Sequence, residues 1–218
     1  MQPTMSRNTA RPAGRGTDQV LWLVRHGEST WNTLGLAQGH NDQARLTPHG
    51  IRQAWRVVGQ LCDRPIRALY ASDLHRAMET AAPLASVLGL PVQRDARLRE
   101  RCLGVLEGTA TAAVPAALTG LAADRVADPD VRPPGGESLR DFYQRVAGFA
   151  ADVTAAGPEG GEIAVVAHGG TLRMLTAYLG GIDVERMRWA PMVNGCVLRW
   201  PGYKAQFQQV NPAERQDR

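Results

Sequence analysis

Three short apolar runs, each followed directly by polar or cationic residues, constrain the fold of this chain more than any other feature. They are residues 20–24 (VLWLV), 66–72 (IRALYAS) and 162–167 (EIAVVA). Short runs that are rich in branched side chains and bounded by polar residues are typical of strands buried on both faces. Strands of this kind belong to parallel sheets that helices cover. The runs therefore predict a buried, mostly parallel sheet.

A helix with a clear start lies between the first two runs. Thr47 is a good N-cap, and Pro48 suits the first helical position because its missing N–H would have no partner there. The apolar residues that follow are spaced three or four apart, so one face of this helix is expected to lie on the sheet. That face carries Ile51, Ala54, Trp55, Val58 and Cys62.

Two more helices are predicted after the second and third runs. Asp73 can cap a helix over residues 74–87, which Gly89 would end because glycine adopts the left-handed conformation easily. The third run leads to a helix over residues 172–179, which the glycines 180–181 would end.

Another helix is predicted to begin at Ser138. Ser138 and Asp141 have the spacing of a capping box, in which each side chain accepts from the backbone of the other residue. Apolar residues at helical spacing predict its inward face. These residues are Leu139, Phe142, Val146, Phe149 and Val153.

The order of these elements predicts the fold class. Strands that alternate with helices indicate an α/β fold, here a three-layer sandwich with a mostly parallel sheet and helices on both faces. Residues 196–200 and 203–210, around Pro201-Gly202, suggest a terminal antiparallel hairpin. Residues 111–134 are rich in Ala, Pro and Asp, and we expect a helical or irregular excursion near the pocket.

Length and charge limit the number of domains and the kind of partner. With 218 residues and 44% apolar content, we expect a single domain over residues 19–210, between flexible tails at 1–18 and 211–218. The net charge of +4 includes +2 from the N-terminal tail, so a nucleic-acid-binding face is not expected. No run approaches the about 18 apolar residues of a membrane span, and we expect a cytoplasmic protein.

The cysteines and histidines argue against several other chemistries. Cys62, Cys102 and Cys196 are odd in number and form no CxxC, so neither a disulfide framework nor a zinc site is predicted. None of them has an arginine six positions later, which excludes a cysteine-dependent phosphatase. The chain contains no HExxH, no HxxxH and no aspartate cluster, and no metal site is predicted.

Cationic residues follow the predicted strands. Arg25-His26 ends the first strand, Arg76 follows the second, and His168-Gly169 follows the third. Ligands of parallel sheets bind at the carboxyl ends of the strands, so these residues are expected to meet in one pocket. Arginine binds phosphate oxygens through two N–H groups at once, and the helix start at Gly169 adds backbone N–H groups. The pocket is therefore predicted to bind the phosphate group of a ligand.

A histidine in such a pocket can act as a nucleophile. Attack of His26 on phosphorus would form a phosphohistidine and divide one difficult displacement into two easier ones. The leaving oxygen then needs a proton, and Glu100, in LRERCLG, is the carboxyl group best placed to supply it.

Five motifs in this order resemble the histidine phosphatase superfamily, in its phosphoglycerate-mutase-like branch (branch 1). They are RHGES with Trp31-Asn32 after it, SDLHRAMETA, LRERCLGVLEG, PPGGES and AHGG. The resemblance covers roughly residues 20–200 and implies the phosphoglycerate-mutase-like fold.

The resemblance also implies roles for individual residues. His26 matches the phosphorylated nucleophile and Glu100 the proton donor. Phosphate-binding positions are matched by Arg25, Arg76, His168, Asn32, Gln38 and Gly39, with Gly169 beside them. The family's chemistry uses no metal and no other cofactor.

Three functions remain open at this point. The leading one is a phosphomonoesterase that acts on a small soluble phosphate ester. The first alternative is a phosphoglycerate mutase. Glu100-Arg101 agrees with such mutases, but Leu103 stands where they carry a tyrosine, and the region has no lysine. The second alternative is a non-catalytic module that binds a phosphorylated ligand. A homodimer is possible, because the C-terminal hairpin could pair with another chain.

Overall fold

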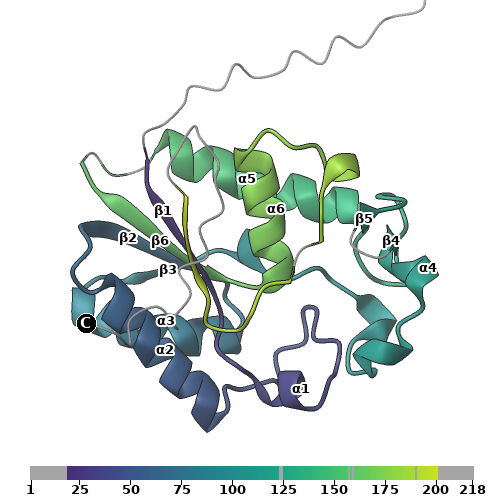
Figure 1. Cartoon of the computed structure of the whole chain (residues 1–218), viewed down its shortest axis with the longest axis horizontal. Helices are drawn as coiled ribbons and strands as arrows, with labels where there is room; N and C mark the ends of the chain where they lie inside the picture. Colours follow the sequence, from purple (N-terminus) through teal and green to yellow (C-terminus); the bar gives the residue numbers. More distant parts are fainter. Residues whose placement is uncertain (1–18, 123–124, 157, 159, 190, 201–218) are drawn as a thin grey trace, which may run out of the picture.

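One five-stranded sheet forms the centre of the structure, a computed structural model that describes residues 19–122, 125–156, 158, 160–189 and 191–200. The strand order is β3-β2-β6-β1-β7 (Figure 1). Neighbouring strands are parallel, except that β7 pairs with β1 in the antiparallel direction. The strands are β1 (Leu21–Arg25), β2 (Ile66–Ala71), β3 (Val92–Arg94), β6 (Glu162–Ala167) and β7 (Val197–Trp200).

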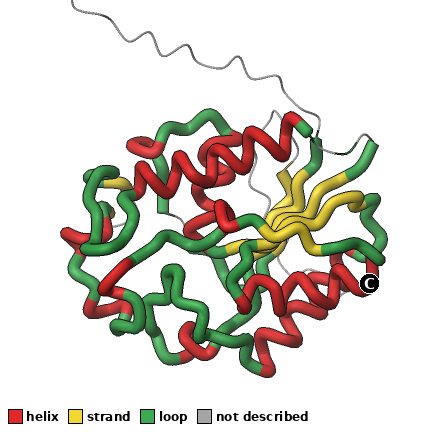
Figure 2. The backbone as a smooth tube through the Cα atoms, turned by 180° about the vertical axis from the view of Figure 1, so that it is seen from behind, coloured by secondary structure: helices red, strands yellow, loops and turns green. Residues whose placement is uncertain are grey.

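Helices cover both faces of this sheet (Figure 2). On one face, α2 (Pro48–Leu61) and α3 (His75–Leu88) pack together, and on the other α5 (Leu139–Ala155) and α6 (Gly169–Leu179) do so. Side chains of β1 alternate between two cores, since Leu21 and Leu23 belong to one and Trp22 and Val24 to the other. The prediction of a three-layer α/β sandwich with a mostly parallel sheet is confirmed.

The start of α5 is as predicted. Ser138 is the N-cap, and its side chain and that of Asp141 form a reciprocal capping box. All five apolar residues predicted to face inward are buried. The helix is therefore fixed at its first turn by local hydrogen bonds and along its length by packing.

The predicted apolar face of α2 is partly wrong. Ile51 and Trp55 are about half exposed, with 51% and 56% of their surface open to solvent, whereas Val57 and Leu61 are buried. The rotation of α2 is set by a close backbone contact. A Cβ atom on Gly50 would lie 2.0 Å from the carbonyl oxygen of Glu28, so this helix face must press against the loop after β1.

Two predicted helix starts also differ from the structure. Asp73 does not cap α3, whose N-cap is Leu74 without a side-chain hydrogen bond. The Asp73 carboxylate instead accepts two hydrogen bonds from Arg99, at 2.7 and 2.5 Å, since an ionic partner is available. Helix α6 begins at Gly169, three residues earlier than predicted. The local pattern did not indicate this start, because glycine has a low helix propensity.

The rest of the described chain consists of short elements. Residues 111–134 contain two short helices and a two-stranded ribbon, which agrees with the expected excursion. The predicted tails at 1–18 and 211–218 and the second strand of the hairpin lie outside the described residues. No helix in the described ranges is long and apolar enough to cross a membrane. The short elements are α1 (Thr30–Thr33), η1 (Ala96–Leu98), η2 (Gly104–Leu106), η3 (Thr111–Ala113), α4 (Ala116–Thr119), β4 (Leu121–Ala122), β5 (Arg125–Val126) and η4 (Val184–Arg186).

Candidate active site

The carboxyl ends of three neighbouring strands bring the predicted residues together. Strand β1 leads to His26, β6 to His168 and β2 to Ser72. The His26 N–H donates to the Ala167 carbonyl at 2.9 Å, which extends the pairing of β1 with β6 past the last strand residue. The two histidine rings consequently lie close together, with centroids 5.1 Å apart and ring planes tilted by 59°.

His26 is held as a neutral imidazole. Its Nδ1 lies 2.7 Å from the Gly27 carbonyl oxygen, and since a carbonyl only accepts, Nδ1 carries the proton. Burial lowers the pKa of His26 well below its usual value, and the cationic Arg76 and Arg25 lower it further. The Nε2 atom is therefore left with a free lone pair, which a nucleophile requires.

His168 is neutral in the opposite tautomer. Arg76 Nε, which only donates, lies 3.3 Å from Nδ1 of His168, so Nε2 carries the proton and donates to Ser72 Oγ at 2.9 Å. Burial, then Arg76 and then His26 lower the pKa of His168 well below its usual value. Both ring nitrogens of His168 thus have partners before any ligand binds.

Arg76 is completely buried and ties the pocket loop to the sheet. It donates to the carbonyl oxygens of Gly39 at 2.9 Å and Asn41 at 2.8 Å. With the bond to His168, three of its five N–H groups are used within the protein. Burial lowers the pKa of Arg76 to about 10, so the side chain remains a cation at neutral pH.

Arg25 is the last residue of β1 and directly precedes His26. Its Nη1 donates to the Met192 carbonyl, and its Nε is buried without a hydrogen-bond partner among the described residues. Gly169 lies close by, since a Cβ atom there would be 3.4 Å from Arg25 Nε and 3.2 Å from Arg173 Nη1. A buried donor without an acceptor is uncommon in proteins, and it fits a site that an anion occupies.

Glu100 lies between η1 and η2, and its carboxyl group meets the start of α6 close to these cations. Its two carboxylate oxygens accept from the backbone N–H groups of Arg101 and Gly170, each at 2.9 Å. A Cβ atom at position 170 would displace this carboxyl group, because it would lie 2.1 Å from Glu100 Oε1. Burial lowers the pKa of Arg25 and of Arg76, and the nearby Glu100 carboxylate partly opposes this effect.

Asn32 and Gln38 lie together in the wall beside His26. Both side chains contact the buried Ser29: Asn32 Oδ1 accepts from its N–H at 3.0 Å, and Gln38 Oε1 accepts from its hydroxyl at 3.1 Å. Asn194 joins them by donating to the His26 carbonyl and to Asn32 Oδ1, both at 3.1 Å. Every predicted site residue therefore lies in one connected region, while their binding roles stay predictions.

Three residues of this region were not predicted from the sequence. Ser72 ends the second apolar run, and its place at a strand end could have identified it. Asn194 lies in a loop without a motif, so no sequence signal indicated it. Arg173 lies on α6 with its guanidinium over the ring of Trp189, 4.8 Å from the centroid, and its one-turn spacing from Gly169 was a usable signal.

The charges of the region indicate what it can hold. Arg25, Arg76 and Arg173 are cations, the Glu100 carboxylate offsets one of these charges, and His26 and His168 are neutral. A dianion would therefore complete the charge balance. Within the described ranges, no three His, Cys, Asp or Glu residues are grouped so that they could hold a metal ion. The absence of a metal or cofactor from the reaction stays a prediction.

Comparison with known families gives one match that covers most of the chain. The family described as "Histidine phosphatase superfamily (branch 1)" matches residues 21–212. The chain is 33% identical over 168 residues to "Putative phosphoserine phosphatase 2" of Hydrogenobacter thermophilus, covering 77% of this chain and 81% of that protein. It is 36% identical over 180 residues to "Probable phosphoglycerate mutase GpmB" of Klebsiella pneumoniae, covering 82% and 83%.

A solved structure agrees with these sequence matches. A mycobacterial glucosyl-3-phosphoglycerate phosphatase in complex with inorganic phosphate superposes with a TM-score of 0.71 at 33% identity, covering 83% of this chain and 88% of that one. The similar proteins thus include both phosphatases and a mutase.

Proposed function

Because this chain belongs to the histidine phosphatase superfamily (branch 1), we propose that it is a metal-independent phosphomonoesterase that hydrolyses a small soluble phosphate ester through a phosphohistidine. The observation that carries the proposal is the state of His26. Its imidazole is neutral, its Nδ1 is fixed by the Gly27 carbonyl, and two arginines flank it. A neutral imidazole beside fixed cations is suited to attack a phosphate dianion.

The first step transfers the phosphoryl group to the protein. His26 Nε2 forms a bond to phosphorus while the bond from phosphorus to the ester oxygen breaks. Arg25 and Arg76 stabilise the charge on the phosphoryl oxygens, and their N–H groups are already oriented by contacts with backbone carbonyls. The protonated carboxyl group of Glu100 donates its proton to the leaving alcohol.

The second step regenerates the protein. A water molecule gives a proton to the Glu100 carboxylate and attacks phosphorus, and the bond from phosphorus to His26 Nε2 breaks. Inorganic phosphate leaves, and both residues return to their starting state. Glu100 can serve in both directions because each of its oxygens accepts only one backbone hydrogen bond and keeps a lone pair.

The surroundings of Arg101 support hydrolysis over mutase chemistry. In the mutases that the sequence resembles, an arginine after the acid helps to hold a phosphoglycerate. Here the Arg101 side chain is buried and donates to the carbonyl oxygens of Glu137 at 2.8 Å, Thr119 at 2.5 Å and Val131 at 3.0 Å. Three of its five N–H groups are therefore used by the protein's own backbone.

Arg132 differs from Arg101, because it is an exposed side chain that forms an ion pair. Its Nη2 lies 2.6 Å from a carboxylate oxygen of Asp141. With Leu103 in place of a tyrosine, few groups remain to retain a product for a second phosphoryl transfer. Water is then the acceptor that reaches the phosphohistidine.

The test is phosphate release from a panel of phosphomonoesters that includes 3-phosphoglycerate, with EDTA present. We expect release that EDTA does not change and that His26→Ala lowers by about 10⁴-fold or more. His49→Ala is the matched control, since His49 is an exposed residue of α2, and it should retain the wild-type rate.

Two results would contradict the proposal. Residual turnover in His26→Ala close to that of the wild type would rule out a phosphohistidine intermediate at His26. Isomerisation of 3-phosphoglycerate, primed by a bisphosphoglycerate and without net phosphate release, would assign the mutase activity instead.

A further inference from the structure

The acid Glu100 lies in a segment that has almost no regular structure. Residues 99–103 run between η1 and η2 outside any helix or strand. Their backbone groups lack the repeating partners that a sheet or helix supplies, so other groups must fix the carboxyl group in place. A carboxyl group that transfers a proton needs a fixed position, because an error of about 1 Å can cost about 10²-fold in rate.

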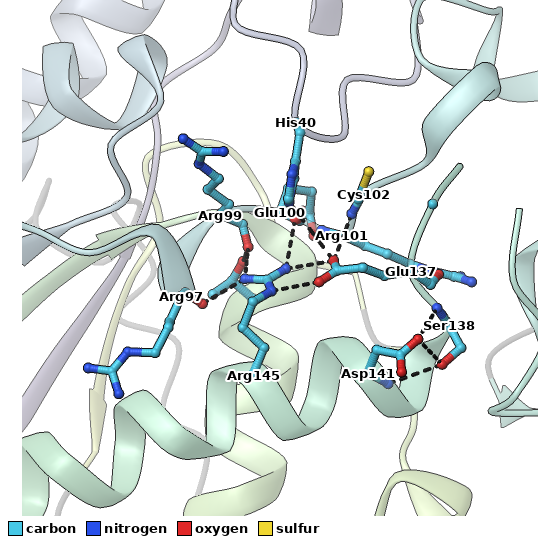
Figure 3. Close-up of polar contacts among 12 residues, drawn as sticks. His40, Arg97, Arg99, Glu100, Arg101, Cys102, Glu137, Ser138, Asp141 and Arg145 are labelled. Carbon is cyan, nitrogen blue, oxygen red and sulfur yellow. Dashed lines mark hydrogen bonds and ion pairs between the residues drawn. The ribbon is translucent and has the colours of Figure 1, made fainter. Parts of the chain in front are cut away.

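One side chain of α5 holds this segment by three backbone carbonyls. Arg145 Nη1 donates to the carbonyl oxygens of Arg97 at 2.7 Å and Arg99 at 3.1 Å, and Nη2 donates to that of Glu100 at 3.1 Å (Figure 3). The guanidinium also lies over the ring of the buried Phe142, 4.9 Å from its centroid.

Glu137 completes the arrangement. Its carboxylate accepts from Arg145 Nε at 2.7 Å and Nη2 at 2.8 Å, so all five N–H groups of Arg145 are used. The same carboxylate accepts from the backbone N–H of Cys102 at 2.9 Å. Burial alone would raise the pKa of Glu137, but Arg145 and the Cys102 N–H outweigh it, and the pKa lies below its usual value.

We propose that Glu137 and Arg145, here called the Glu137–Arg145 pair, are positioning residues that set the place of the Glu100 carboxyl group. The inference rests on the proposed function. The pair grips the segment on both sides of Glu100, through the carbonyls of residues 97, 99 and 100 and through the N–H of residue 102. The capping box at Ser138 fixes the start of α5 and so the spacing between the two residues.

Loss of the pair's positioning role has a kinetic effect that differs from the effect of a general loss of stability. If it positions the acid, its loss slows only the reactions that need a proton on the leaving oxygen. An alkyl phosphate needs that proton, because an alkoxide is a poor leaving group. p-Nitrophenyl phosphate does not, because p-nitrophenolate leaves without one.

The experiment measures kcat/KM of Arg145→Gln for both esters. We expect a loss of about 10- to 100-fold with glycerol phosphate and of no more than about threefold with p-nitrophenyl phosphate. Inhibition by inorganic phosphate should not change, since the arginines and histidines that bind phosphate are left intact. Glu100→Gln is the reference and should show the same dependence on the ester, more strongly.

Three further variants separate position from charge and from folding. Arg145→Lys retains the charge but has neither the planar shape nor the five N–H groups, and it should behave like Arg145→Gln. Glu137→Gln should show a smaller loss of the same kind. Arg140→Gln, on the same helix but bound to the exposed Asp130 and Glu185, should match the wild type with both esters. If Arg145→Gln does not fold, Arg145→Lys and Glu137→Gln decide the question.

The two proposals fail in distinguishable ways. Wild-type protein that releases phosphate from neither ester and from no other phosphomonoester of the panel would contradict the proposed function. Wild-type protein that hydrolyses both, with variants of the pair that lose equal activity on the two esters, would leave the proposed function intact and overturn the positioning role.

Discussion

The two halves of the candidate site are held in place by different kinds of hydrogen bond. In the phosphate half, His26 and His168 directly follow paired strands, and the sheet's own hydrogen bonding continues into His26, whose N–H donates to the Ala167 carbonyl. In the acid half, Glu100 lies in an irregular segment that side chains of α5 and α6 hold by its carbonyls. The first half depends on strand order and the second on individual side chains.

This difference predicts how each half responds to mutation. A substitution in the phosphate half should slow every substrate alike, because all of them carry the same phosphate group. A substitution in the acid half should slow substrates whose leaving group needs a proton more than substrates whose leaving group does not. Three predictions test this contrast, in order of decreasing effect.

The largest effect is expected at Arg76. Arg76→Lys keeps a cation but cannot reach the Gly39 and Asn41 carbonyls and the His168 ring together. We expect kcat/KM to fall by about 10²- to 10³-fold for alkyl and aryl phosphates alike. Arg45→Lys, at an exposed arginine paired with Glu79, is the control. A loss confined to alkyl esters would show that Arg76 acts with the acid half, and it would contradict the difference expected between the two halves.

A smaller effect is expected at Gly170. The added methyl group of Gly170→Ala must displace the Glu100 carboxyl group, since its Cβ atom would lie 2.1 Å from Oε1. We expect about 10- to 100-fold lower kcat/KM with an alkyl phosphate and little change with p-nitrophenyl phosphate. The matched control is Gly59→Ala in α2, which meets no atom within 4 Å and should raise stability by about 0.5–1 kcal/mol. Equal losses with both esters would show that Gly170 does not act through the acid.

The smallest effect concerns stability as the pH falls. Burial, and then the neighbouring arginines, place the pKa of His26 and of His168 well below the usual 6.5. Below about pH 6.5 the unfolded chain binds protons that the folded chain does not, so the free energy of unfolding falls with falling pH. Each histidine contributes a slope of at most about 1.4 kcal/mol per pH unit, and the slope vanishes below its folded pKa.

Urea unfolding without phosphate, at about pH 7.5 and about pH 5.5, measures this slope. His168→Asn should lose less stability between the two pH values than the wild type does, while His49→Gln, at an exposed position, should lose as much. Equal losses in all three proteins would mean that the phosphate half does not carry the buried neutral histidine that its geometry indicates.

The contrast also explains which parts of the site could be predicted from the sequence. His26 and His168 directly follow apolar runs, and parallel strands place such residues at one edge. Glu100 could be predicted from the sequence, because it is a carboxyl group within a motif. The hydrogen bonds by which Arg145 holds its segment could not be predicted. A side chain that donates to the carbonyls of a segment 45 residues away leaves no periodicity and no spacing to recognise.

The fold shows the same division. The three central strands and the start of α5 follow from local pattern and capping, and they lie where expected. The exposed face of α2 could not be predicted from the local pattern, because two stripes of side chains on that helix are nearly equal in apolar content. The choice between them is made by the contact of Gly50 with the loop after β1, which no local pattern contains.

A rapid-quench experiment with an ester that is labelled in its phosphate group tests the phosphohistidine most directly. We expect transient label on the chain that is stable to alkali and labile to acid, that maps to His26, and that decays to inorganic phosphate at least as fast as kcat. Turnover without any protein-bound label, or label that persists in His26→Ala, would contradict a phosphohistidine at His26.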